Sequence, residues 1–221
     1  MPAENVDVVF VLDASGSMSD CFKGVVQNIE SMLLQFRQAS FKFRLDAVIH
    51  DSEKTRTCFN PSERDIYHPT QTTRFFTSDV NEFNSVLSRV SVGANEDMLY
   101  ALDCALDFPF GPVQTTNRVV VMFSDEPFEG NVHQEHQDKL DELVEKIEAR
   151  RIKFFLAMPR CDGAEVLENA RNASYTEANG SGLSSFDFSK FFDTIGKTVT
   201  RVSAQMTGEP SYNKALFGQD H

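Results

Sequence analysis

The chain has 221 residues, of which 41% are hydrophobic and 24% charged, and its formal net charge is −12 at pH 7. This length suits one α/β domain with a well-buried sheet, and the composition excludes a disordered or fibrous chain. The negative charge argues against a nucleic-acid partner, because phosphate binding needs a clustered basic surface. The apolar runs are far shorter than the ~20 residues that span a bilayer, and the first residues do not resemble a secretion signal. We therefore expect a cytoplasmic protein that binds neither nucleic acid nor membrane.

Apolar runs alternate with segments of helical periodicity, a pattern typical of a doubly wound α/β fold with a mostly parallel central sheet flanked by helices. In chain order, we predict strands at 7–12, 41–49, 75–76, 119–123 and 153–158. Helices are predicted at 22–37, 81–90, 97–106, 136–150 and 188–203. The polar stretch 51–73 indicates a long irregular connection. One domain is expected over 1–206, followed by a C-terminal tail at 207–221.

The most informative stretch follows the first predicted strand and reads Asp13-Ala14-Ser15-Gly16-Ser17. It places one carboxylate and two hydroxyls at alternating positions, and these hard oxygen ligands suit Mg²⁺ or Mn²⁺. Gly16 permits a tight turn that directs the three side chains to one point. The same residue types also form turns and cap helices, so a purely structural role is the alternative.

The pattern Asp-x-Ser-x-Ser after a buried strand resembles the metal-ion-dependent adhesion site of von Willebrand factor type A domains. This resemblance extends from about residue 6 to about residue 204 and implies the Rossmann-like fold of that family. In the family a later strand ends in Thr/Ser-Asp-Gly, with the aspartate facing the metal. Ser124-Asp125-Glu126 resembles this segment at Asp125, with a glutamate where the family usually has glycine.

A third loop of the family commonly reads Gly-Gly-x-Thr, and its threonine binds the metal, whereas a subset of members carries an acidic residue instead. Residues 93–97 contain no threonine, and Glu96 or Asp97 occupies the corresponding position. The resemblance therefore implies a metal held by Asp13, Ser15, Ser17, Asp97 and Asp125. The alternative for Asn95, Glu96 and Asp97 is that they only cap the next helix and complement its dipole.

The expected function is a divalent-metal-dependent protein–protein interaction module. A partner's acidic side chain would replace a water on Mg²⁺ or Mn²⁺, although three nearby carboxylates would weaken that attraction. The compact acidic chain also resembles bacterial cytosolic type A proteins associated with tellurium resistance and stress. Two alternatives stay open: a Mg²⁺- or Mn²⁺-dependent hydrolase or phosphotransferase that uses the same loops, and a metal-free scaffold of the same fold.

We expect no enzymatic activity, because each nucleophile motif in the sequence is incomplete. Ser15 stands where an aspartyl phosphotransferase would need its second aspartate, and Ser15 and Ser17 lack the Gly-x-Ser-x-Gly context of a hydrolase. Phosphate-binding glycine motifs are also missing from the sequence. His50 is expected to be a surface or hydrogen-bonded residue. The cysteines, which are scattered singly, are expected to be reduced thiols: Cys21, Cys58, Cys104 and Cys161.

Overall fold

The computed structural model describes residues 4–51, 54–59, 74–90, 98–128, 139–180 and 183–206. In this part of the chain a six-stranded sheet has the strand order β3-β2-β1-β4-β5-β6. The short strand β3 (Lys54–Thr57) pairs antiparallel with β2 at one edge. The other strands run parallel to one another: β1 (Asn5–Asp13), β2 (Lys42–Asp51), β4 (Thr116–Phe123), β5 (Ile152–Met158) and β6 (Ala173–Glu177).

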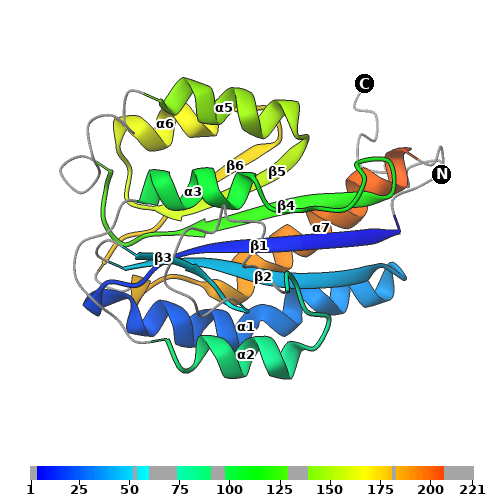
Figure 1. Cartoon of the computed structure of the whole chain (residues 1–221), viewed down its shortest axis with the longest axis horizontal. Coiled ribbons are helices and arrows are strands. Elements are labelled where there is room, and N and C mark those ends of the chain that lie inside the picture. Colours follow the sequence, from blue (N-terminus) through cyan, green and yellow to red (C-terminus); the bar gives the residue numbers. More distant parts are fainter. Residues whose placement is uncertain are drawn as a thin grey trace, which may run out of the picture.

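Helices cover both faces of this sheet (Figure 1). One face packs against α1 (Ser19–Gln38), α2 (Val80–Leu87) and α7 (Phe188–Met206). The opposite face packs against α3 (Met98–Leu106), α5 (Leu140–Ala149) and α6 (Asp162–Glu168). The doubly wound, mostly parallel α/β fold expected from the sequence is confirmed. Among the described residues, none of the helices combines the length and the apolar character needed to cross a bilayer.

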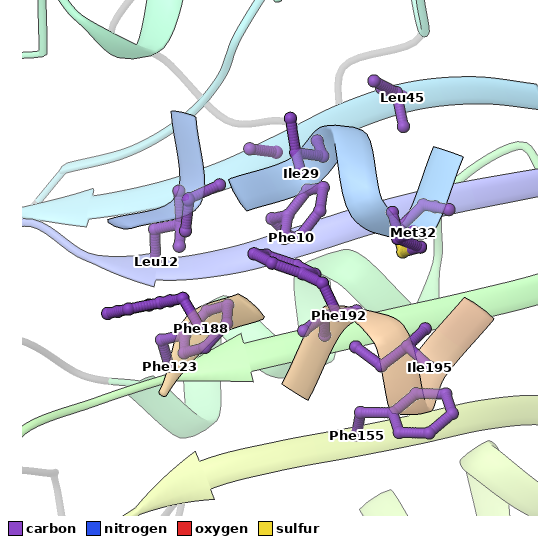
Figure 2. Packing of buried hydrophobic residues seen from close by; sticks show 14 of the residues in the cluster. Phe10, Leu12, Ile29, Met32, Leu45, Phe123, Phe155, Phe188, Phe192 and Ile195 are labelled. Carbon is purple, nitrogen blue, oxygen red and sulfur yellow. The ribbon is translucent and has the colours of Figure 1, made fainter. Parts of the chain in front are cut away.

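β1 lies at the centre of the sheet, and its side chains contribute to both hydrophobic cores. Val8, Phe10 and Leu12 belong to the core under α1 and α7, whereas Val9 and Val11 belong to the core under α3. Neighbouring side chains of a strand point to opposite faces, so a strand covered on both sides is apolar at successive positions, as β1 is from Val8 to Leu12. Figure 2 shows Phe10 and Leu12 among the residues contributed by α1, α7 and the neighbouring strands.

Several local predictions were wrong. Residues 75–76 form no strand; instead Thr77 makes an isolated antiparallel bridge with Leu45. Phe76 adopts a positive φ of 61°, which takes the backbone out of the extended region, and its N–H donates a hydrogen bond to the buried Asp46 carboxylate at 2.9 Å. The stretch 51–73 was expected to be irregular, yet it contains β3. β6 and α6 were missed because both are short, and β6 is polar, with no alternation to reveal it.

The contact between α1 and α7 depends on glycines that allow close approach. A Cβ atom added at Gly24 would lie only 2.4 Å from Cε2 of Phe188, and one at Gly196 would lie 2.7 Å from Cγ of Gln35. Separations this short force neighbouring atoms to shift. The two glycines therefore set how closely the last helix lies on the first.

We predict that Gly24→Val lowers the free energy of unfolding by about 1–3 kcal/mol, because the added side chain overlaps the Phe188 ring. Urea unfolding followed by circular dichroism measures this change. Gln27→Ala is the matched control, since Gln27 lies exposed on the same helix and should shift stability by no more than about 0.5 kcal/mol. Equal midpoints for the parent and Gly24→Val would contradict the close packing.

Candidate metal centre

The carboxyl ends of β1 and β4 define the place in this sheet where a ligand is expected to bind. β1 leads into α1 on one face, whereas α5, the next described helix after β4, lies on the other face. Such a point, where connections from adjacent parallel strands diverge, leaves a crevice outside the strand ends. Leu12 and Phe123 are register partners in β1 and β4. The residues that follow them, Asp13 and Ser124, therefore meet at the crevice, with Ser124 Oγ 3.5 Å from Asp13 Oδ2.

The loop after β1 folds back on itself and brings its polar groups together. The Ser15 N–H donates a hydrogen bond of 2.7 Å to Asp13 Oδ1. The hydroxyls of Ser15 and Ser17 lie 2.8 Å apart and share a hydrogen bond. A 3₁₀ turn at Gly16–Met18 then leads into α1, and neither Ser15 before that turn nor Met18 before α1 makes a side-chain capping bond. The hydroxyls of the two serines face each other instead.

The loop after β4 is fixed by Ser124, which our sequence analysis did not single out as a site residue. Ser124 is buried, and its hydroxyl donates to the Glu126 carbonyl at 2.9 Å and accepts from the Glu126 N–H at 3.2 Å. These bonds hold a tight turn around Asp125, which is half-buried, while Glu126 is exposed. The available sequence signal was its position directly after the predicted buried strand at 119–123.

Asp13 is a buried carboxylate among other negative charges. Only 1% of its surface is exposed, and burial raises its pKa to about 6, opposed by hydrogen bonds from Ser15 and increased by the charges of Asp125 and Glu126. The same negative charges act on Cys21 at the start of α1. Burial raises the pKa of its thiol, and the charges of Asp13 and Asp125 raise it further. A bound cation would reverse this unfavourable electrostatic balance.

The residues present fit a hard divalent cation. Asp13 and Asp125 supply carboxylate oxygens, and Ser15 and Ser17 supply hydroxyl oxygens, which together suit Mg²⁺ or Mn²⁺. Within the described ranges, no group of three or more His, Cys, Asp or Glu side chains is placed to hold a metal. The predicted third-loop ligands, Glu96 and Asp97, lie outside the described residues. The described part of the site is therefore a set of two carboxylates and two hydroxyls.

His50 lies beside this site but within a strand. It is buried in β2, it is the register partner of Asp13, and its carbonyl accepts a hydrogen bond of 3.0 Å from the Ala14 N–H. Its ring makes an edge contact with Tyr100 of α3, with centroids 6.2 Å apart. The backbone of His50 thus extends the β1–β2 pairing to the first residue of the loop.

No protein-family profile matches this chain, and the search of curated proteins also gave no match. Solved structures do match it, among them the VWA domain of SpRpn10, over 83% of this chain and 93% of that one. The TM-score is 0.59 and the sequence identity is 11%, so the likeness establishes the fold alone. The chain has the fold of a von Willebrand factor type A domain, as the resemblance of the first loop implied.

We predict that the metal-free protein loses stability as the pH rises from about 4 to about 7. The pKa of Asp13 is about 6 in the folded state and about 3.9 in an unfolded chain. The folded state therefore holds a proton that the unfolded chain releases. The resulting stabilisation is complete below about pH 4 and is lost as the pH passes about 6, a change of up to about 3 kcal/mol.

Asp13→Asn should remove this part of the pH dependence in urea unfolding curves recorded with a chelator. Asp20→Asn is the control, because it removes the same formal charge from an exposed position in α1. Asp46, whose pKa burial raises to about 7, contributes a slope of the same sign to every variant. The test is therefore how the pH dependence of the free energy of unfolding differs between variants. Parallel curves of this free energy against pH for the parent and Asp13→Asn would refute the assignment of the slope to Asp13.

Proposed function

We propose that this chain is a protein-interaction module whose binding face is the crevice at the carboxyl ends of β1 and β4, and that Mg²⁺ or Mn²⁺ bound there completes the face. The observation that carries the proposal is the buried Asp13 carboxylate, which accepts a hydrogen bond from the Ser15 N–H on one side and lies beside the Ser124 hydroxyl of the β4 loop on the other. Burying a carboxylate without a cation is costly, so a site of this kind gains from a bound metal.

The ion would be held by Asp13, Ser15, Ser17 and Asp125, together with Asp97 or Glu96 from the third loop. Mg²⁺ usually keeps several waters, and a carboxylate of a partner protein can take the place of one of them. These protein side chains would hold the ion and exclude water from the side of the ion that faces the protein. The partner then recognises both the exposed side of the ion and the surrounding loops.

A binding role is favoured over catalysis by the contacts of the serines. The Ser15 hydroxyl shares hydrogen bonds with the Ser17 hydroxyl and with the Asp13 carboxylate, as expected for oxygens gathered around one ion, and neither serine lies in the Gly-x-Ser-x-Gly context of a hydrolase. We therefore propose that the chain catalyses no hydrolysis or phosphoryl transfer with these loops.

We place the module in the cytoplasm, because its cysteines are scattered singly along the sequence and do not show the spacing of a disulfide framework. The acidic composition also agrees with the bacterial stress- and tellurium-associated proteins that the sequence resembles.

Calorimetric titration with MgCl₂ or MnCl₂ should show binding of one ion per chain to the full-length protein. Asp13→Ala should abolish this heat, because it removes the carboxylate that both loops surround. Asp20→Ala is the matched control and should bind like the parent, since Asp20 is exposed and pairs with Lys23. Indistinguishable titrations of the parent and Asp13→Ala would show that the metal does not bind in this crevice.

Asp97→Thr should strengthen the capture of an acidic ligand by the metal-loaded protein. Removing one carboxylate near the ion leaves it more electrophilic, by on the order of 1 kcal/mol for one screened charge, or about fivefold in affinity. Titration of a short glutamate-containing peptide, with and without chelator, measures this change. Asp97→Asn removes the negative charge without introducing a threonine hydroxyl, so it separates the effect of the charge from the effect of the hydroxyl. Equal affinity of all three proteins, or binding that survives the chelator, would exclude recognition through the ion.

A further inference from the structure

A second concave site lies on the α7 side of the sheet and shares no residue with the candidate metal centre. It is a pocket of about 390 Å³ between β5, β6 and the first turns of α7, a volume within the range of ligand sites. Phe155, Phe186 and Phe191 line its apolar part, and the ring centroids of Phe186 and Phe191 are 5.2 Å apart. The pocket therefore presents aromatic surface to a ligand.

The rim of this pocket is polar and mostly acidic. Ser174 and Thr176 of the edge strand β6 line one side, and the exposed charged residues around the opening are Glu177, Asp187 and Lys190. Asp187 also accepts a hydrogen bond from the Lys190 N–H at 2.9 Å, which begins α7. A ligand that suits the pocket would carry aromatic or aliphatic side chains next to a basic residue.

We propose that this pocket binds the chain's own segment 212–217, which follows α7. Tyr212, Leu216 and Phe217 supply the apolar side chains, and Lys214 between them complements the acidic rim. Thr207-Gly208-Glu209-Pro210 precedes this segment, and glycine and proline are the residue types that end helices and reverse the chain.

The tether has the length that this binding requires. α7 runs away from the pocket, and its last residues lie at the right of Figure 1, at the opposite end from the carboxyl ends of the strands. At ~1.5 Å per residue, Met206 lies about 18 Å along the helix axis from Thr194, which lines the pocket. An extended chain from Met206 spans about 33 Å by Leu216. Leu216 and Phe217 therefore reach the pocket with residues to spare, and the short tether gives them a high effective concentration.

Tryptophan fluorescence can test this binding in the full-length chain, because the protein contains no Trp. Phe217→Trp introduces a single reporter in the segment. We expect blue-shifted emission that acrylamide quenches weakly. Adding Thr194→Lys, which places a long charged side chain at the exposed pocket wall, should shift the emission to the red and raise the quenching constant several-fold. Thr198→Lys, one turn further along α7, is exposed and outside the pocket, and it should leave both readings unchanged.

The outcomes separate the possible occupants of the pocket. Emission that is already red-shifted and easily quenched in Phe217→Trp would overturn the proposal. Blue-shifted emission that does not change when Thr194→Lys is added would mean that the segment is buried outside this pocket, and it would also overturn the proposal. A blue shift that grows with protein concentration would mean that the segment binds the pocket of a second copy, which contradicts binding within one chain. Circular dichroism of each variant verifies that the fold is retained.

Discussion

β1 ends at Asp13, which has 1% of its surface exposed, and the arrangement around the crevice at the carboxyl ends of the strands depends on accommodating that charge. Between the two helical layers the strand is apolar from Val8 to Leu12, and the polar side chain of Asp13 follows where the strand ends. The Ser15 N–H, the paired serine hydroxyls and Ser124 then surround the carboxylate. Asp125 and Glu126 add negative charge rather than neutralising it. A cation bound at the crevice would offset this accumulation of negative charge.

The central layers of the fold could be predicted because their signals are strong and local. β1, β4 and β5 are nearly continuous apolar runs, and α1 and α7 have long amphipathic stripes. The edges could not be predicted in the same way. β6 reads Ala-Ser-Tyr-Thr-Glu, which is half exposed and polar, so only its pairing with β5 defines it as a strand. Phe76 was misassigned because its conformation follows from long-range contacts, namely the hydrogen bond to Asp46 and the Arg44 guanidinium over its ring at 4.6 Å.

In the candidate metal centre, too, some features follow from local sequence signals and others from long-range contacts. Asp13, Ser15 and Ser17 could be proposed as metal ligands because residue type and spacing carry the chemistry within one loop. Asp125 could be proposed because its segment resembles the Thr/Ser-Asp-Gly segment of the type A family. The meeting of these loops depends on β4 lying next to β1, a long-range pairing that spacing alone does not encode. Ser124 illustrates the difference, since its role follows from its distances to Asp13 and Glu126 rather than from a motif. The α7 pocket likewise depends on tertiary packing, since β5, β6 and α7 each contribute lining residues.

The most direct test of the central claim is a crystal structure of the full-length protein grown with MnCl₂, using the anomalous signal of manganese to locate the ion. We expect one strong anomalous peak in the crevice between β1 and β4, within coordination distance of oxygens from Asp13, Ser15 and Ser17, which for such hard cations is about 2.0–2.6 Å. An empty crevice at saturating Mn²⁺, or a peak bound only by residues elsewhere on the surface, would contradict this expectation.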